Sequence, residues 1–203
     1  MWQEYVRFNM RVIVGCEYSG VVRDAFIAEG HTAVSVDLLP GEKPGPHYME
    51  DLLKFCRRNK DNYDMLIAHP PCTHLAVSGA RWFKDKKEQQ EEALQFVRDI
   101  MDLPFNYIAI ENPVSIISSR IRKPDQIIQP WMFGDEFQKT TCLWLKNLPK
   151  LEPTNIVGKG DFHVTKSGKR LPKWYHDSWG DGKARSKTFE GIAKAMAQQW
   201  GKL

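Results

Sequence analysis

Short apolar segments alternate with a glycine-rich turn near the start of the chain, and this alternation constrains the fold most. Residues 11–14 (Arg-Val-Ile-Val) are an apolar, β-branched run that predicts a buried strand. A turn from Gly15 to Gly20 follows, and in residues 21–29 the apolar side chains recur at helical spacing. Residues 32–36 predict a second strand, which ends at Asp37. Strand, glycine turn, helix, strand and acid together predict the opening unit of a doubly wound α/β fold.

The same alternation continues through the middle of the chain. Residues 51–60 predict a short helix, residues 64–68 a buried strand, residues 86–101 an amphipathic helix and residues 107–110 another buried strand. Each strand is followed by polar or unusual residues, and in open α/β sheets ligands bind at that carboxyl edge. The sequence therefore predicts an α/β protein with a doubly wound, mostly parallel sheet and a small C-terminal lobe.

Regular patterning weakens after about residue 120. Residues 142–145 predict a strand, residues 162–169 a hairpin, and residues 187–200 a closing helix. We expect three parts: residues 1–150 as the core, residues 151–185 as a small basic and aromatic lobe, and residues 186–203 as a C-terminal helix that returns to the core.

Composition excludes several classes of protein. The 203 residues are 42% hydrophobic and 27% charged, which suits a folded domain rather than a disordered or membrane-embedded chain. No apolar run approaches the roughly 20 residues that a spanning helix needs, and residues 1–5 are too polar for a signal peptide. The four cysteines form no Cys-x-x-Cys pair, which disfavours a disulfide framework and a zinc finger. We expect a cytoplasmic protein with free thiols.

The turn between the first strand and the first helix is a candidate ligand loop. Gly15 and Gly20 have the spacing of a Walker A loop, but Val21 and Val22 stand where Lys and Ser or Thr belong, which disfavours a P-loop enzyme. The glycines let backbone approach a ligand at a helix N-terminus. Asp37 lies about where an acid accepts hydrogen bonds from ribose hydroxyls. Two interpretations stay open: a nucleoside cofactor, or a tight turn with a surface aspartate.

The segment His69-Pro70-Pro71-Cys72-Thr73-His74 is the sharpest local signal. Two prolines directly after a buried strand fix the backbone and present Cys72 rigidly at the sheet edge. Such a cysteine acts as a nucleophile if its thiolate is stabilised. The alternatives are a packed small hydrophobic residue, or a metal site of His69, Cys72 and His74, for which the sequence shows no fourth ligand.

Glu111, Asn112 and Pro113 follow the buried strand at residues 107–110. In a parallel sheet this carboxylate points into the same cleft as Cys72. Partial burial would raise the pKa of Glu111, so that it donates a proton near neutrality. The alternative is a solvated glutamate at a strand end.

Together these pieces resemble the cytosine-C5 DNA methyltransferase family, as a small, phage-type member with a reduced target-recognition region. The match covers most of the chain in the family's order. The matching residues are Gly15 to Gly20 with Asp37 (cofactor loop and ribose acid), Glu50-Asp51-Leu52 (adenine contact), Pro70-Pro71-Cys72 with Ser78-Gly79 (catalytic loop), Glu111-Asn112 (Glu-Asn-Val motif), Gln138 (start of Gln-x-Arg-x-Arg) and residues 186–195 (closing motif).

The resemblance implies S-adenosyl-L-methionine as cofactor and DNA as partner, with no metal and no membrane. In it, Cys72 attacks C6 of a cytosine that is flipped out or unpaired, and Glu111 holds or protonates N3. Methyl transfer to C5 and loss of the C5 proton then release the enzyme. The implied cofactor-binding residues are Gly15, Glu17, Tyr18, Ser19, Gly20, Asp37, Asp51 and Pro70. The implied substrate-binding residues are Ser78, Asn112, Gln138, Lys139 and Thr140.

The C-terminal half carries the cations for a nucleic-acid partner, although the net charge of the whole chain is only +4. They are Lys159, Lys166, Lys169, Arg170, Lys173, Lys183, Arg185 and Lys187. Trp174, Tyr175 and Trp179 interleave with them and are candidates for stacking on bases. The alternative is a solvated lobe whose aromatic side chains complete a small core.

Three departures from the family pattern keep other functions open. Pro113 replaces the Val after Glu-Asn, and Thr140 and Cys142 replace the two arginines of Gln-x-Arg-x-Arg, with Lys139 as a single nearby cation. The region for reading a target is short, so specificity is relaxed or needs a protein partner. The alternatives are a catalytically altered relative that binds nucleic acid or protein, or a methyltransferase acting on another pyrimidine or on an exocyclic amine.

Overall fold

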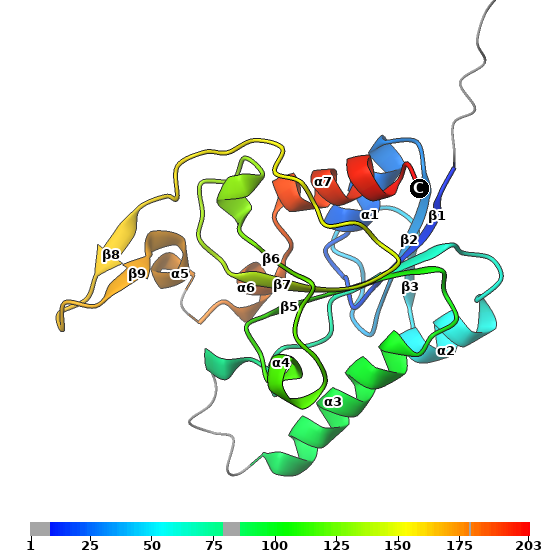
Figure 1. Ribbon diagram of the computed structural model, residues 1–203, viewed down its shortest axis with the longest axis horizontal. Helices are drawn as coiled ribbons and strands as arrows, with labels where there is room; N and C mark the ends of the chain where they lie inside the picture. Colours follow the sequence, from blue (N-terminus) through cyan, green and yellow to red (C-terminus); the bar gives the residue numbers. More distant parts are fainter. Residues whose placement is uncertain (1–8, 79–85, 179) are drawn as a thin grey trace, which may run out of the picture.

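A seven-stranded sheet forms the centre of the molecule (Figure 1). The computed structural model describes residues 9–78, 86–178 and 180–203. Across the sheet the strands lie in the order β3-β2-β1-β4-β5-β7-β6. Their bounds are Arg11–Gly15 (β1), Thr32–Asp37 (β2), His47–Met49 (β3), Met65–Ala68 (β4), Tyr107–Pro113 (β5), Gln126–Ile128 (β6) and Thr141–Lys146 (β7). Neighbours from β3 to β5 pair in parallel, whereas β7 is antiparallel to β5 and β6.

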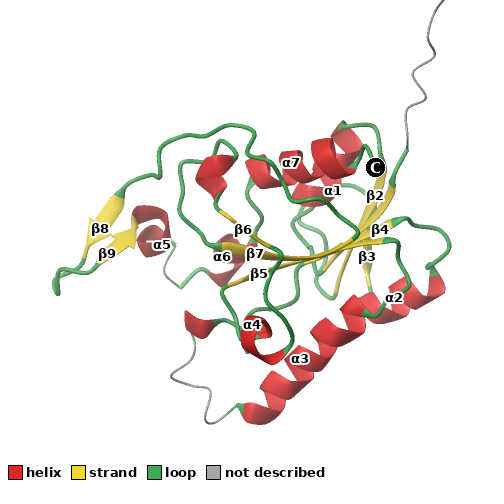
Figure 2. Ribbon diagram, in the orientation of Figure 1, coloured by secondary structure: helices red, strands yellow, loops and turns green. Residues whose placement is uncertain are grey.

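Helices cover both faces of this sheet (Figure 2). One face packs against α1 and α7, and the other against α2 and α3. The bounds are Val21–Ala28 (α1), Leu52–Arg58 (α2), Lys87–Met101 (α3), Ile117–Arg120 (α4) and Glu190–Trp200 (α7), with a 3₁₀ turn at Pro130–Met132. The structure therefore confirms the predicted α/β fold class with a doubly wound, mostly parallel sheet.

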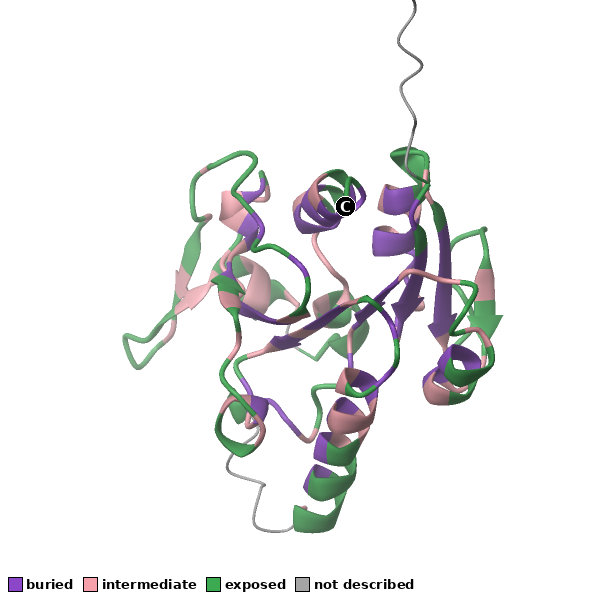
Figure 3. Ribbon diagram, turned by 45° about the vertical axis from the view of Figure 1, so that its right-hand side comes forward, coloured by how far each residue is buried: buried purple, intermediate pink, exposed green. Residues whose placement is uncertain are grey.

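The continuous apolar runs of the sequence follow from burial on both sides of the sheet, which Figure 3 shows. Val12, Ile13 and Val14 of β1 are all fully buried. Because successive side chains of a strand point to opposite faces, Val12 and Val14 pack in the core under α1 and α7, and Ile13 packs in the core above α2 and α3. A strand with two covered faces has no polar alternation, which is the pattern seen at residues 11–14.

Two predicted boundaries are wrong. β5 was expected to end at Ile110, but it continues through Pro113 because β7 pairs with it there, with Glu111 opposite Leu143. Glu111 therefore stands on a paired strand rather than in a loop. The closing helix begins at Glu190 and not at Lys187, because Lys187 and Phe189 have extended backbone.

A small C-terminal region projects from the sheet on the left of Figure 1. It contains an antiparallel hairpin of β8 (Phe162–Val164) and β9 (Arg170–Pro172), which confirms the predicted hairpin. Two short helices follow, α5 (Lys173–Asp177) and α6 (Gly182–Ser186), and α7 then packs on α1. Figure 3 shows the hairpin largely exposed.

Three features singled out in the sequence lie outside the described residues: residues 1–5, Gly79 and Trp179. Within residues 9–78, 86–178 and 180–203, no helix combines the length and the apolar character that crossing a membrane demands.

Arg23 of α1 is a fully buried cation that fixes the turn before the helix and the loop after β2. Its guanidinium donates to Asp24 Oδ1 (2.8 Å), to Ser35 Oγ (3.1 Å) and to the carbonyl of Pro44 (3.1 Å). Gly20 has φ 72°, and a Cβ on it would clash with Arg23 Nη2. Glycine is therefore required at position 20 both by its backbone conformation and by the neighbouring cation.

We expect Gly20→Ala to destabilise the protein by roughly 1–3 kcal/mol more than Gly168→Ala. Both glycines have a left-handed backbone, with φ 72° at Gly20 and φ 79° at Gly168, so both variants carry the same backbone strain. Nothing lies within 4 Å of a Cβ at Gly168, whereas at Gly20 the Arg23 guanidinium must move. Urea denaturation measures the difference, and equal losses in the two variants would contradict this explanation.

Candidate active site

The carboxyl ends of β1, β2, β4 and β5 open into one cavity of about 880 Å³. Parallel strands place these ends at a common edge of the sheet. The pairing of β4 with β5 aligns Ala68 with Ile110. His69 and Glu111 are the next residues along these two stretches of the chain, and they lie side by side. The loops that carry the predicted ligand residues therefore meet in this cavity.

The Glu17 carboxylate occupies the N-terminus of α1. Glu17 is only 4% exposed, and its two oxygens accept hydrogen bonds from the backbone amides of Val22 (2.6 Å) and Arg23 (3.2 Å). Burial raises the pKa of Glu17, although His69 and these amides partly oppose that rise. A side chain of the protein therefore already satisfies the amides of Val22 and Arg23, and the approach of a ligand to this loop stays a prediction. A phosphate has no vacant place there.

Most of the predicted cofactor-binding residues line the cavity. They are Glu17, Tyr18, Ser19, Asp37, Asp51 and Pro70. Gly15 and Gly20 have a different environment, because a Cβ on Gly15 would meet Leu52 and one on Gly20 would meet Arg23. Both glycines therefore shape the loop by close packing within the protein.

Two acids mark the end of the cavity beside β2. Asp37 Oδ1 accepts from the amide of Leu39 at 2.9 Å, and Asp51 Oδ1 caps α2 by accepting from the amide of Lys54 at 2.8 Å. Leu38 and Leu39 also line the cavity and are 74% and 46% exposed. Sequence reasoning missed these two leucines, although two apolar residues directly after the strand-end acid were a visible signal.

The loop that carries Cys72 is held at both sides. The backbone amide of His69 donates to the carbonyl of Gly15 at 2.9 Å, and the Asn112 side-chain amide donates to the carbonyl of Pro70 at 2.8 Å. Asn112 is 1% exposed, so this contact is inside the protein and positions the loop. Its assignment to substrate binding stays a prediction.

Cys72 is exposed, and it lines the cavity. The protein around its sulfur raises the pKa of the thiol by desolvation, and the charge of Glu111 raises it further. Lys139 and Arg185 act in the opposite direction but do not outweigh these effects. Cys72 is therefore a neutral thiol near neutral pH, and a nucleophilic role needs a group that accepts its proton.

Glu111 has the opposite shift from the one expected from its burial. Burial acts to raise its pKa, but the hydrogen bond from His69 and the charge of Lys139 outweigh burial, and the pKa is lowered. His69 Nδ1 lies 3.1 Å from Glu111 Oε2, and the two side chains are only 9% and 12% exposed. The expectation of a raised pKa was wrong because it considered burial without these partners.

The predicted substrate-binding residues also line the cavity: Ser78, Asn112, Gln138, Lys139 and Thr140. Lys139 Nζ donates to the carbonyls of Arg185 (3.0 Å) and Lys187 (3.4 Å). Thr140 Oγ1 accepts from the Gln129 side-chain amide at 2.9 Å. Lys139 thus joins the core to residues near α6.

Residues 182–188, which we name the closing segment, cover part of the cavity. The Tyr18 hydroxyl donates to the carbonyl of Lys183 at 3.0 Å, and Lys187 pairs with Glu42 at 2.6 Å. Arg185 comes close enough to Cys72 for its charge to lower the thiol pKa. Sequence reasoning assigned Arg185 only to phosphate contact, because nothing local indicates that it reaches Cys72.

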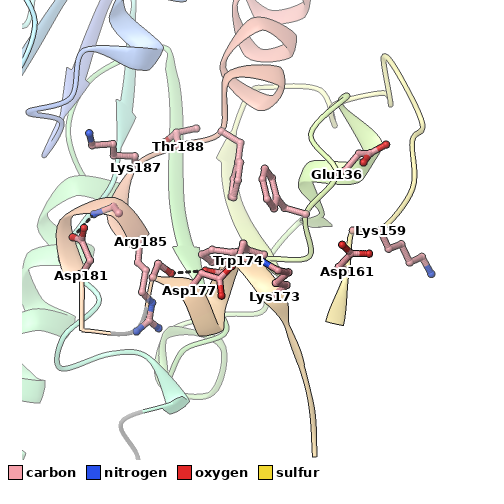
Figure 4. Close-up of a pocket in the computed structure, with 15 residues that line it drawn as sticks. Glu136, Lys159, Asp161, Lys173, Trp174, Asp177, Asp181, Arg185, Lys187 and Thr188 are labelled. Atoms are coloured by element: carbon pink, nitrogen blue, oxygen red, sulfur yellow. Dashed lines mark hydrogen bonds and ion pairs between the residues drawn. The ribbon is translucent and has the colours of Figure 1, made fainter. Parts of the chain in front are cut away.

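A second cavity of about 730 Å³ shares part of its lining with the first (Figure 4). Trp174, Arg185, Lys187 and Thr188 line both cavities. Trp174 packs edge-on against Phe137 and Phe189, with ring centroids 6.4 and 5.8 Å away, and its Nε1 donates to the carbonyl of Gln138 at 2.8 Å. These contacts favour the interpretation in which Trp174 completes a small core of the lobe.

Acidic, cysteine and histidine side chains do not gather into a metal site in the described parts of the chain. His69 instead bonds to Glu111. The interpretation of His69, Cys72 and His74 as metal ligands therefore has no geometric support among the residues described.

Comparisons with known proteins give a fold likeness only. No family model and no curated protein matches the sequence. Among solved structures, the chain is similar to a candidate DNA modification methyltransferase encoded within a prophage (E. coli), with 15% identity and a TM-score of 0.47. The alignment covers 74% of this chain and 52% of the other, so this chain spans about half the length of that protein. Such a score defines no family, and the chemistry rests on the site's own residues.

We expect Cys72 to be the most readily alkylated of the four cysteines, but slowly at neutral pH. Cys56 and Cys142 are buried, and burial raises the pKa of Cys16 to about 12. Because Glu111 raises the pKa of Cys72, Glu111→Gln should accelerate alkylation of Cys72 several-fold near neutral pH. Iodoacetamide labelling with mass spectrometry measures each site. An unchanged or slower rate in Glu111→Gln would contradict the electrostatic coupling.

Proposed function

We propose that this protein is an S-adenosyl-L-methionine-dependent methyltransferase that methylates C5 of cytosine in DNA through a covalent adduct with Cys72. One observation carries the proposal: Cys72 and Glu111 line the same cavity, at the carboxyl ends of neighbouring parallel strands. A nucleophile and an acid–base group on one side of a cavity are the pair that attack at C6 with protonation at N3 requires.

The cofactor end of the cavity fits a nucleoside that has a positive charge and no phosphate. Glu17 already fills the N-terminus of α1, which removes the usual phosphate site of such folds. The carboxylates of Glu17, Asp37 and Asp51 line the cavity and favour a cation. S-adenosyl-L-methionine has both properties, and when bound it supplies the methyl group.

The residues of this chain then have separate tasks. Cys72 attacks C6 of the ring, and Glu111 passes a proton to N3 as charge leaves the C5–C6 bond. Asn112 keeps the loop of Cys72 in place through its bond to the Pro70 carbonyl. Asp37 and Asp51 hold the cofactor, with Leu38 and Leu39 as its apolar contacts.

DNA reaches this cavity from the side of the C-terminal lobe. A base in a duplex is inaccessible to such a thiol, so the target cytosine must be flipped out or unpaired. Lys166, Lys169 and Arg170 lie in or beside the exposed β8–β9 hairpin, where they are available to phosphates. Arg185 stacks over the Tyr175 ring at 4.1 Å, which holds its guanidinium at the wall of the cavity.

Cofactor binding is the first test. We expect isothermal calorimetry to show S-adenosyl-L-methionine binding to the wild type and at least tenfold weaker binding to Asp37→Ala. The variant lacks the carboxylate that accepts hydrogen bonds from the ribose hydroxyls. Asp61→Ala is the matched control, since Asp61 is an exposed aspartate in the turn after α2. Absence of binding by the wild type would refute the cofactor assignment.

Covalent trapping is the second test. DNA that contains 5-fluorocytosine should become attached to the wild type in the presence of S-adenosyl-L-methionine, because fluorine at C5 blocks the final elimination. Cys72→Ser should abolish the adduct, whereas Cys142→Ala should retain it, because Cys142 is buried away from the cavity. Denaturing gel electrophoresis detects the complex. Methyl transfer that survives Cys72→Ala would instead support transfer to an exocyclic amine.

A further inference from the structure

His69 is held between two strands with one ring nitrogen engaged and the other without a partner. Its Nδ1 lies 3.1 Å from Glu111 Oε2, and its side chain is 9% exposed. Its Nε2 is buried and makes no hydrogen bond to any of the described residues. Proteins seldom leave a buried ring nitrogen unpaired, so this atom needs a functional or solvent explanation.

Charged and titratable groups surround the His69–Glu111 pair. Glu111 from β5 bonds to the His69 ring, and Glu17 after β1 is close enough for the charge of His69 to lower the Glu17 pKa. The charge of Lys139, before β7, lowers the pKa of Glu111, and so does the hydrogen bond from Thr141 of β7. Cys72 follows in the same loop and responds to the charge of Glu111.

We propose that His69 is a positioning residue whose pairing with Glu111 stores the proton that Cys72 loses and that N3 of the target cytosine must gain. This inference rests on the proposed C5 methyl transfer, and it adds a residue that the Pro-Pro-Cys and Glu-Asn motifs do not contain.

The proton balance closes within the site. The S–H bond of Cys72 breaks, and its proton passes to the His69–Glu111 pair. The sulfur then forms a bond to C6, the π electrons of C5=C6 move to C4–C5, and the π electrons of N3=C4 move to N3. N3 takes the stored proton through Glu111, which leaves an enamine with a nucleophilic C5. No external acid or base is consumed.

The charges around Cys72 and Glu111 require a group that holds a proton between the two steps. The Cys72 pKa is raised, so the thiol must lose a proton before attack, and the Glu111 pKa is lowered, so Glu111 has no proton of its own near neutrality. The hydrogen-bonded pair of His69 and Glu111 is the group that can accept the proton of Cys72 and deliver it to N3. An imidazole is the side chain that both accepts and releases a proton in this pH range.

The test is the rate of covalent trapping on 5-fluorocytosine DNA, measured against pH, in His69→Asn. The asparagine amide takes the place of Nδ1 and still donates to Glu111, but it does not titrate. We expect trapping to be about 100-fold slower at neutral pH, with loss of the acid limb of the wild-type bell-shaped profile. His31→Asn is the matched control, because His31 lies at the opposite edge of the sheet, before β2.

The outcomes separate this inference from the proposed function. Trapping by His69→Asn at the wild-type rate, with the wild-type pH profile, overturns the role of His69 and leaves the proposed function intact. Cofactor binding by the wild type without any trapping overturns the C5 chemistry and this inference with it. If His69→Asn does not bind cofactor or is unfolded, the pH profile of trapping by His69→Gln decides: loss of the acid limb supports the role of His69, and the wild-type rate and profile overturn it.

Discussion

The parallel register of β4 and β5 determines what this site can do. Ala68 of β4 pairs with Ile110 of β5. The next residue of each stretch forms the His69–Glu111 hydrogen bond, and the residue after that forms the contact of Asn112 with the Pro70 carbonyl. A slip of one residue would place Glu111 on the opposite face of the sheet, because strand side chains alternate. The side chains of both strands are close-packed between two layers of helices, and this packing opposes the slip.

The carboxylate of Glu17 caps the helix that borders the other half of the cavity. A helix N-terminus in this fold is ordinarily an anion site, because its first amides have no partner within the helix. Here the amides of Val22 and Arg23 are already paired with Glu17, and the nearby Arg23 cation is itself paired with Asp24. The N-terminus of α1 is therefore capped by a side chain of the protein, and the amides of Val22 and Arg23 are not available to a phosphate.

The sequence predicted the sheet and its carboxyl edge because both depend on local pattern. Strands β1, β2 and β4 lie where the apolar runs indicated, and the prediction that Cys72 and Glu111 share a cleft needed only the parallel order. The direction of the Glu111 pKa was not predictable in the same way. It depends on His69 and Lys139, which contact or face Glu111 only after strands far apart in sequence have paired. The Glu17 cap was likewise hidden, since a glutamate in a glycine turn does not show which amides it accepts from.

Contacts between the lobe and the core tie the thiol to the position of the closing segment. Hydrogen bonds from Tyr18 and Lys139 and the ion pair of Lys187 with Glu42 hold residues 182–188 on the core. Each is worth on the order of 1 kcal/mol or less when exposed to solvent. Arg185 belongs to this segment, and its charge is one of the two that act to lower the pKa of Cys72. The electrostatic environment of the thiol therefore depends on residues from both the core and the lobe.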